Sequence, residues 1–394
     1  MGRGRRRGLG GRDLEFRHVF GADVAQIAPA AGTGWNRFSA IPRLWAAVVL
    51  VLLAALMVAG WSGGVGGKRV QPAKPTSMKF EGMVGDHALY LNILRKMEAG
   101  QSYYPAATET QRAHRYPLHP FFTVRLPTQA EIMAVIGLRG SVALLTLTGL
   151  AAILLWRKRL MADDDLPRYA RFGALLMAAN MSQIVSRQWV LMHEVVAGVL
   201  IALALALYRP ARPWPAMAVI ALALAMRETV LPVAMLLGLF ALIDRDWRAA
   251  AGWLGIGLSF LALMAWHAAT LTAFVRPDDM TTPGWSGMGG WPAYLSFVHV
   301  SSAFRFLPAW TMVPVVPLAL LGWAAWRSRL GTTMLIVQLG YAAMLMLFAR
   351  PNNFYWAMLI EPTLFVGLIF APAALLALYR SIRAEPSPVS VPAV

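Results

Sequence analysis

The 394-residue sequence contains no cysteine. Disulfide bonds, thiolate catalysis and metal sites built on cysteine are therefore excluded. Charged residues are also scarce, because they make up 14% of the chain whereas a soluble protein carries about a quarter. Hydrophobic residues reach 58%. This balance indicates a polytopic membrane protein.

Acidic residues are the scarcer charge: 19 Asp and Glu stand against 36 Lys and Arg, for a net charge of +17. In a soluble domain this surplus would suggest a nucleic-acid partner. In a membrane protein, Lys and Arg mark cytoplasmic loops and face anionic lipid headgroups. We favour the second interpretation and expect no nucleic-acid partner.

Long apolar runs dominate the chain, and a helix needs about 20 apolar residues to cross a bilayer. Ten segments can be drawn: 44–61, 132–155, 172–187, 190–208, 215–226, 229–243, 249–270, 306–326, 331–349 and 354–379. They predict an all-α, polytopic bundle of about ten transmembrane spans. Three segments are short, and short helices are tolerated where their ends face a protein cavity. In an alternative that stays open, 215–243 forms one long helix, which would reverse the topology of everything downstream.

Basic residues predict the orientation. The chain up to residue 43 holds eight arginines, and further pairs or clusters occupy every second loop: 157–171, 208–212, 244–248, 326–329 and 379–383. Short loops rich in Lys and Arg stay in the cytoplasm, so both termini are expected there. We predict a disordered basic tail over 1–43, a membrane domain over 44–379 with a first outer loop at 62–131, and a cytoplasmic tail at 380–394.

The first outer loop contains a predicted helix that begins near Asp86. Its apolar positions Leu89, Ile93, Leu94 and Met97 recur at helical spacing, which is typical of an amphipathic helix lying in the membrane interface; Gly100 would end it. Asp86 is expected either to cap this helix or to supply a carboxylate that takes a proton or holds a divalent cation. The two roles are compatible.

This threading places nearly all unusual polar residues on the non-cytoplasmic side. They are Asp86, His87, Arg125, Arg187, His193, Glu194, Arg227, Glu228, Asp278, Asp279, Arg350, Asn352 and Asn353. Ionisable groups near a membrane core are costly and usually functional. An active site at the outer face is therefore predicted.

Several of these groups have two interpretations. Arg227 with Glu228 is either a self-neutralising pair or a guanidinium that binds phosphate and is oriented by the carboxylate. His193 and Glu194 are adjacent, so their side chains diverge by about 100° on a helix, and a zinc site is not expected. The Gly- and Trp-rich loop 271–304 is either a mobile cover or an ordinary interfacial loop, and Asp278–Asp279 could assist a cation.

A family resemblance rests on three motifs. An acidic residue opens an interfacial helix and is followed by a Gly-x-x-Tyr-Tyr pattern; further on come MRETVLP (226–232) and RPNNFYW (350–356). The residues of the first motif are Asp86, His87, Tyr90, Gly100, Tyr103 and Tyr104. Together with the span order, these motifs resemble the GT-C superfamily of glycosyltransferases, either the polyprenyl-phosphomannose-using family 87 or family 39-like enzymes. Many GT-C enzymes have two acids here, whereas this chain has Gly-Asp-His, with Glu81 five residues upstream.

The resemblance implies transfer of a sugar from a polyprenyl-phosphate donor to a carbohydrate or glycolipid acceptor, outside a bacterial inner membrane. Asp86 would be the catalytic base, and it could also hold Mg²⁺ or Mn²⁺. The expected substrate-binding residues are His87, Tyr90, Tyr103, Tyr104, Arg125, His193, Glu194, Arg227, Glu228, Arg350, Asn352, Asn353 and Tyr355.

Three other functions compete with this one. A transporter or lipid flippase would have charges at the bilayer midplane, broken helices and related halves; the 215–243 region fits, but no internal repeat is visible. A non-catalytic membrane assembly protein would tolerate loss of Asp86. An acyltransferase would place a histidine base deeper in the bundle.

Overall fold

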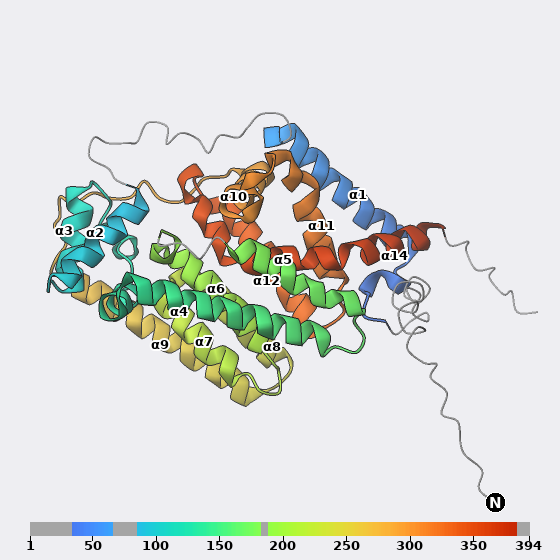
Figure 1. Ribbon diagram of the computed structural model, residues 1–394, viewed down its shortest axis with the longest axis horizontal. Coiled ribbons are helices and arrows are strands. Elements are labelled where there is room, and N and C mark those ends of the chain that lie inside the picture. Colours follow the sequence, from blue (N-terminus) through green and yellow to red (C-terminus); the bar gives the residue numbers. More distant parts are fainter. Residues whose placement is uncertain (1–33, 66–84, 183–187, 384–394) are drawn as a thin grey trace, which may run out of the picture.

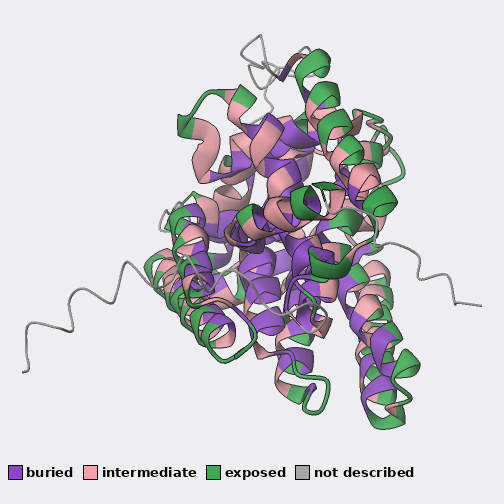
Figure 2. Cartoon of the chain, turned by 90° about the vertical axis from the view of Figure 1, so that its right-hand side faces the viewer, coloured by how far each residue is buried: buried purple, intermediate pink, exposed green. Residues whose placement is uncertain are grey.

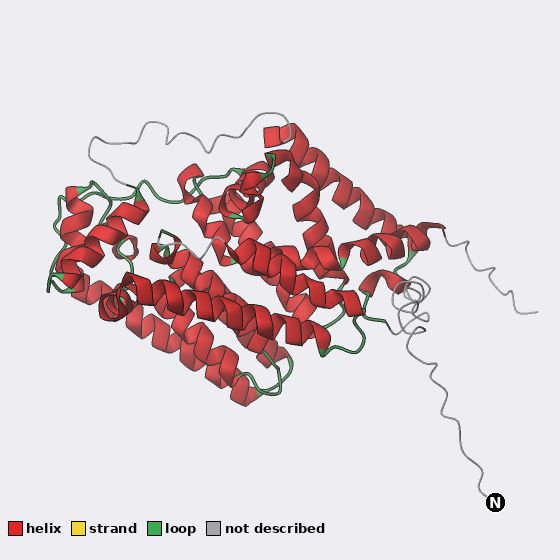
Figure 3. Ribbon diagram, in the orientation of Figure 1, coloured by secondary structure: helices red, strands yellow, loops and turns green. Residues whose placement is uncertain are grey.

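The computed structural model describes residues 34–65, 85–182 and 188–383 (Figure 1). Within these ranges the chain is helical and forms no strand, only two isolated β-bridges (Figure 3). The α-helices are α1 (Arg43–Gly60), α2 (Asp86–Glu98), α3 (Tyr103–Ala113), α4 (Thr128–Met161), α5 (Gly173–Met181), α6 (His193–Leu207), α7 (Trp214–Met226), α8 (Leu231–Ile243), α9 (Trp247–Leu271), α10 (Gly290–Ser301), α11 (Met312–Ala325), α12 (Arg329–Phe348), α13 (Glu361–Leu364) and α14 (Ala371–Arg383). The all-α class is confirmed.

Each of the ten predicted segments contains a helix, but the helices differ in length. Four stretches are long and apolar enough to cross a membrane: Arg43–Val65, Phe121–Met161, Trp247–Leu271 and Arg329–Phe348. A fifth arises if Glu361–Ile369 and Ala371–Arg383, which meet at a bend of 48°, count as one span. Helices α6, α7, α8 and α11 are apolar but shorter. Several helices could therefore span a membrane, while the number ten is not confirmed.

Helix α6 lies at the centre of the bundle, and most of its side chains are buried. It packs against α4, α7 and the 3₁₀ segment η11 (Pro351–Leu359). A side chain at Gly198 would collide with the carbonyl oxygen of Met358, so the close approach of α6 to η11 requires glycine there. Buried residues gather in the middle of the bundle, and exposed ones lie on its outer helices (Figure 2). Many of the exposed residues are large and apolar.

Helices α7 and α8 form an antiparallel hairpin. Arg227, between them, has extended backbone angles (φ −152°, ψ 121°) and is followed by the 3₁₀ turn η8 (Glu228–Val230). Pro213, at the start of α7, and Ala241, near the end of α8, line the same cavity. The two-helix interpretation of 215–243 is therefore confirmed, and the single long helix is wrong.

The bundle has two chemically different ends. The basic loops gather at one of them, where Asn36 pairs with Trp326 and Asp244 forms an ion pair with Arg329. The first residues of α2, α4 and α6 and the α7–α8 turn meet at the other end, which also carries α3 (Figure 1). The one-sided polar collection predicted from the sequence therefore appears as a spatial cluster.

Parts of the predicted tails are folded. Trp35 is buried, and the side-chain amide of Asn36 donates to the carbonyl of Ala373 at 3.0 Å, so disorder over 34–43 was a wrong prediction. Helix α14 continues to Arg383, beyond the predicted boundary at 380. The predicted tail segments 1–33 and 384–394 lie outside the described residues.

Both predicted outer loops contain an unexpected helix. Residues 62–131 hold α3 besides the expected α2, and residues 271–304 hold α10. Helix α2 buries its expected apolar face on the bundle, and Gly100 follows it with a φ of +95°, as predicted for a helix end. Glu81 and the rest of 66–84 lie outside the described residues.

Candidate functional site

Asp86 is the first residue of α2, and its carboxylate faces Tyr116. Gly85 is the N-cap, and no side chain makes a capping hydrogen bond there, so the capping prediction for Asp86 was wrong. The Tyr116 hydroxyl instead donates to Oδ1 of Asp86 at 2.8 Å. Burial and the nearby Asp86 carboxylate raise the pKa of Tyr116. The phenol therefore stays protonated and can hold the carboxylate in place.

Four charged side chains form what we call the buried charge cluster: Arg125, Glu194, Arg227 and Glu228. Arg227 is 1% exposed; its Nε donates to Oε1 of Glu194 at 2.8 Å, and its Nη1 donates to Glu228. The cluster draws on the segment just before α4, on α6 and on the α7–α8 turn. Two guanidinium groups balance two carboxylates, and their mutual attraction offsets the free-energy cost of removing these charges from water.

Arg125 is less firmly held than Arg227. Its nearest carboxylate oxygens lie at 3.6 Å (Glu228) and 3.9 Å (Glu194), and its side chain is 13% exposed. Its Nε donates to the hydroxyl of Tyr90 at 3.3 Å, and the Tyr90 ring meets the His193 ring edge-on at 4.8 Å. Arg125 is therefore the guanidinium of the cluster that can turn toward a ligand.

Tyr103 and Tyr104 support the segment that carries Arg125. The Tyr103 hydroxyl donates to the carbonyl of Arg125 at 2.6 Å. Nε2 of His267 lies 3.1 Å from the carbonyl of Val124, and Nδ1 lies 3.0 Å from the Tyr104 hydroxyl. Since a carbonyl only accepts, Nε2 carries the proton, and in the neutral ring Nδ1 accepts from Tyr104. Both tyrosines are buried, so they hold this segment from inside the fold.

The RPNNFYW segment closes over the same end. Oδ1 of buried Asn353 accepts from the backbone N–H of Arg350 at 3.3 Å, and its Nδ2 donates to the Tyr355 hydroxyl at 3.3 Å. Tyr355 is buried within electrostatic range of Asp86 and Arg125. Asn352 is exposed. The segment therefore places Tyr355, and not the asparagine pair, beside the cluster.

Two aromatic residues, Phe122 and Trp285, lie between Arg350 and Arg125. The Arg350 guanidinium lies 6.0 Å from the ring centre of Trp285, and that ring lies 5.3 Å from Phe122. The carbonyl of Phe122 accepts from Nη1 of Arg125 at 3.5 Å. Arg350 forms no ion pair with any residue that the structure describes. It is thus a second cation available at this end.

The loop after α9 is fastened to α3 and the following segment. Arg112 holds Asp279 through two hydrogen bonds of 2.6 and 2.7 Å, and the N–H of Leu118 donates to the carbonyl of Met280 at 2.8 Å. The Arg112 hydrogen bond lowers the pKa of Asp279. Asp279 is therefore a structural ion-pair partner, and the backbone bonds argue against a freely moving cover.

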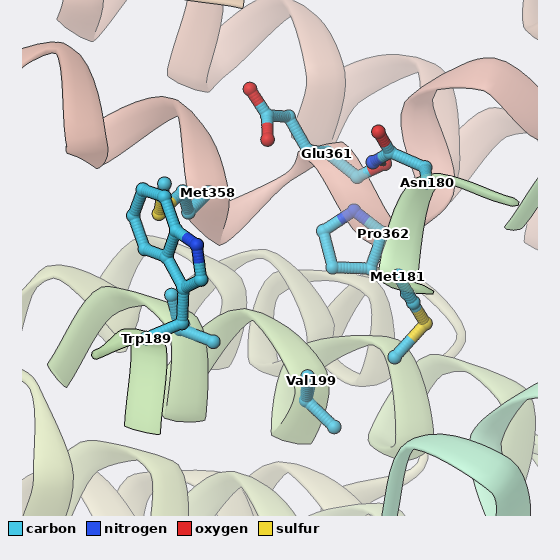
Figure 4. A pocket seen from close by; sticks show the side chains of 8 residues that line it. Asn180, Met181, Trp189, Val199, Met358, Glu361 and Pro362 are labelled. Atoms are coloured by element: carbon cyan, nitrogen blue, oxygen red, sulfur yellow. Dashed lines mark hydrogen bonds between the residues drawn. The ribbon is translucent and has the colours of Figure 1, made fainter. Parts of the chain in front are cut away.

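His87, the residue after Asp86, contacts Trp189, and Trp189 lines a small pocket. The two rings meet edge-on at 5.5 Å, and burial lowers the pKa of His87, which is therefore neutral near pH 7. Behind Trp189 lies a pocket lined also by Asn180, Met181, Val195, Val199, Met358, Glu361 and Pro362 (Figure 4). Glu361 is 2% exposed, and its Oε1 has no hydrogen-bond partner within the described ranges.

A divalent cation finds no ready set of ligands at Asp86. Mg²⁺ prefers several oxygen ligands, but Oδ1 of Asp86 accepts from Tyr116, and Glu194 and Glu228 are committed to arginines. Among residues 34–65, 85–182 and 188–383, no three His, Asp or Glu side chains are grouped for a metal. The residues do not fit a dedicated metal site.

Most of the predicted site residues come together. Arg125, Glu194, Arg227 and Glu228 form the cluster; Tyr90, His193 and Tyr355 border it, and Asp86 with His87 lies beside it. Tyr103 and Tyr104 lie beneath it, Asn352 points to solvent, and Arg187 lies outside the described residues. Sequence reasoning missed Tyr116, Trp189, His267 and Glu361, since no local pattern marks residues whose partners are distant in the chain.

Comparisons of this chain with protein-family models, with curated proteins and with solved structures found no match.

Proposed function

We propose that this protein transfers a sugar from a polyprenyl-phosphate donor to a hydroxyl group of an envelope acceptor, at the non-cytoplasmic face of a bacterial inner membrane. One observation carries the proposal: Asp86, held by Tyr116, shares one end of the bundle with the buried charge cluster. The basic loops occupy the opposite end, in keeping with cytoplasmic termini and about ten spans.

Asp86 acts as the general base. It accepts the proton of the acceptor hydroxyl while that oxygen attacks the anomeric carbon of the donor sugar. The bond between this carbon and the phosphate oxygen breaks, and polyprenyl phosphate leaves with the electron pair. General base catalysis of this kind contributes about 10²–10⁴-fold in rate. The activated sugar arrives on lipid, so no nucleotide site is needed.

Arg125 and Arg350 stabilise the departing phosphate. A guanidinium binds a phosphate through two parallel N–H bonds and stays charged at depth. Arg227 is enclosed by Glu194 and Glu228, whereas Arg125 has longer ion pairs and Arg350 has none in the described part of the chain. We therefore assign phosphate contact to the two looser arginines, and Arg227 fixes the carboxylates around them.

The buried charge cluster makes this end of the bundle rigid before substrate arrives. Arg227 and the two carboxylates are fixed by one another rather than by water, so little reorganisation besides the turn of Arg125 accompanies the development of charge on the phosphate. The donor lipid lies among the apolar helices, and its phosphate reaches the outer boundary, where Phe122 and Trp285 separate the two arginines.

The proposal is tested with the purified protein in vesicles that contain radiolabelled polyprenyl-phosphate hexoses, offered one sugar at a time with an envelope acceptor fraction. We expect transfer of label from lipid to acceptor and release of polyprenyl phosphate. Polyprenyl phosphate alone should raise the thermal unfolding temperature of wild-type protein. Movement of intact donor across the vesicle bilayer without sugar release would instead identify a flippase.

The flippase remains the second candidate because of Glu361. This carboxyl is buried at the start of the 361–369 segment, whose other end meets Ala371–Arg383 at the bend, and its Oε1 is unpartnered among the described residues. An ionisable group at such depth, near a broken helix, is typical of transporters. If Glu361→Gln abolishes lipid movement while Asp86→Asn does not, the protein is a lipid transporter and the proposed sugar transfer is wrong.

A further inference from the structure

A second cavity opens at the basic end of the bundle, away from Asp86 and the buried charge cluster. It encloses about 220 Å³ between the α6–α7 connection and the α8–α9 connection. We call it the basic-end cavity; its lining residues are Tyr208, Pro210, Ala211, Pro213, Ala241, Asp244, Asp246, Ala249 and Trp253. A water molecule in the liquid takes up about 30 Å³, so this space accommodates a small organic group.

Acidic and aromatic side chains line the cavity. Oδ1 of Asp246 caps α9 by accepting from the N–H of Ala249 at 3.0 Å, which leaves the other carboxylate oxygen for a ligand. Tyr208 and Trp253 are buried aromatic walls, and the indole N–H of Trp253 has no hydrogen-bond partner within the described ranges. Carboxylates together with aromatic faces are suited to a cation such as an ammonium group.

Arginines lie next to the lining residues along both connections. Arg209, Arg212, Arg245 and Arg248 are all exposed. Each is adjacent in sequence to a residue that lines the cavity. Asp244 is paired with Arg329, so the half-buried Asp246 is the carboxylate left to a ligand. A group that carries a positive charge next to a negative charge therefore fits both Asp246 and the surrounding arginines.

Apolar side chains extend the same surface. Trp214, which follows Pro213, is 52% exposed, and Trp247, which follows Asp246, is 67% exposed. Helices α7, α8 and α9, which carry these connections, are apolar. Tryptophan at the end of such helices is typical of the membrane–water interface. The exposed surface around the cavity is therefore both basic and apolar.

We propose that the basic-end cavity binds the headgroup of an amine phospholipid. The ammonium group lies between Asp246 and the rings of Tyr208 and Trp253, and the phosphate meets the surrounding arginines. The acyl chains run past Trp214 and Trp247. Ethanolamine is favoured over choline because an ammonium donates hydrogen bonds to a carboxylate, whereas a trimethylated nitrogen has no N–H to donate. This site is independent of the proposed transferase function, since it lies at the other end of the bundle.

The test is native mass spectrometry of the full chain in detergent, titrated separately with phosphatidylethanolamine, phosphatidylcholine and phosphatidylglycerol. Asp246→Asn removes the charge but retains a good capping residue for α9. Asp164→Asn is the matched control, because Asp164 is an exposed acid in the loop after α4 that does not line the cavity. We expect phosphatidylethanolamine to bind wild type and Asp164→Asn equally and Asp246→Asn about tenfold more weakly, which is 1.4 kcal/mol.

Three outcomes would overturn this assignment. The first is equal binding of all three lipids, and the second is unchanged binding of phosphatidylethanolamine by Asp246→Asn. The third is that soluble glycerophosphoethanolamine, which has the headgroup but no acyl chains, raises the unfolding temperature as much as phosphatidylethanolamine does. Melting curves without lipid show whether each variant folds, so loss of binding cannot be confused with loss of structure.

Discussion

Tyr116 donates its hydroxyl to Oδ1 of Asp86 at 2.8 Å, although 30 residues separate them in the chain. The contact joins the segment after α3 to the first turn of α2. Asp86 has the positive end of the α2 dipole behind it and a neutral phenol in front, both of which favour a fixed carboxylate. This relationship gives the first prediction.

Tyr116→Phe should lower the turnover number for sugar transfer about tenfold, because a hydrogen bond to a charged group contributes about 1.5–3 kcal/mol and part of that positions the carboxylate. The KM for the donor should stay unchanged, because the lost hydrogen bond holds the base Asp86, whereas phosphate contact is assigned to Arg125 and Arg350. The measurement is steady-state transfer in vesicles. Tyr379→Phe, at a half-exposed tyrosine of α14, is the control; an equal loss in both variants would contradict the positioning role.

Arg227→Gln should destabilise the protein strongly. Removal of one partner from a buried ion pair costs about 3–5 kcal/mol, because a charge is left buried without compensation. Lys96→Gln breaks an exposed pair with Glu109, whose side chains are 38% and 52% exposed, and should cost less than about 1 kcal/mol. Denaturant melts in detergent compare the two, and similar losses would show that the cluster is not a structural unit.

Arg125→Lys should weaken polyprenyl-phosphate binding by about tenfold, or 1.4 kcal/mol, because an ammonium cannot reproduce the two parallel bonds of a guanidinium. The thermal stability without ligand should change little, since the positive charge remains. Arg276→Lys, an exposed arginine in the loop after α9, serves as the control. Unchanged affinity in Arg125→Lys would move the phosphate site elsewhere.

The Arg112–Asp279 pair should make stability depend on acid. Arg112 lowers the pKa of Asp279 in the folded protein, so the pair stabilises the fold fully above the pKa of the unfolded chain, about 3.9. The contribution is lost as pH falls through the lowered folded value. The difference in unfolding temperature between wild type and Asp279→Asn should therefore be constant near neutral pH and shrink below about pH 4. A difference independent of pH would show that the ion pair contributes nothing.

The helical class and the α7–α8 hairpin could be predicted because both depend on local composition. Two short apolar runs on either side of Arg227 indicated a break, and the chain is indeed extended there. The apolar face of α2 was predicted for the same reason, since its residues repeat at helical spacing. In both cases the sequence pattern and the structure that it predicts lie within a single turn or helix.

Features that depend on distant partners could not be predicted. Gly85, not Asp86, caps α2, because the carboxylate finds a phenol beyond α3. Tyr103 and Tyr104 lie in a loop predicted to be outside the membrane, but each finds a distant hydrogen-bond partner, one on the backbone of Arg125 and one on His267. Composition alone cannot distinguish a lipid-facing tyrosine from one that is enclosed by the fold.

For the site itself, the sequence predicted which residues lie on the same side of the bundle, but not which of them contact one another. The sequence allowed Arg227 either to pair with Glu228 or to bind a phosphate. The structure shows the pair with Glu228, adds Glu194 as a second partner and leaves Arg125 more accessible. The alternation of basic and non-basic loops along the sequence indicates which charged residues lie at the same end of the bundle. Which of them is buried depends on how the segment before α4, the start of α6 and the α7–α8 turn meet.

The most direct measurement is the rate of sugar transfer by Asp86→Asn, beside wild type and the control Asp278→Asn, which changes an exposed acid on the loop after α9. Asparagine keeps the size of the side chain and accepts the Tyr116 hydrogen bond, but it cannot take a proton. We expect the turnover number of Asp86→Asn to fall about 10²–10⁴-fold, with polyprenyl-phosphate affinity retained and Asp278→Asn unaffected. Transfer at the wild-type rate by Asp86→Asn would contradict the assignment of this carboxylate as the base.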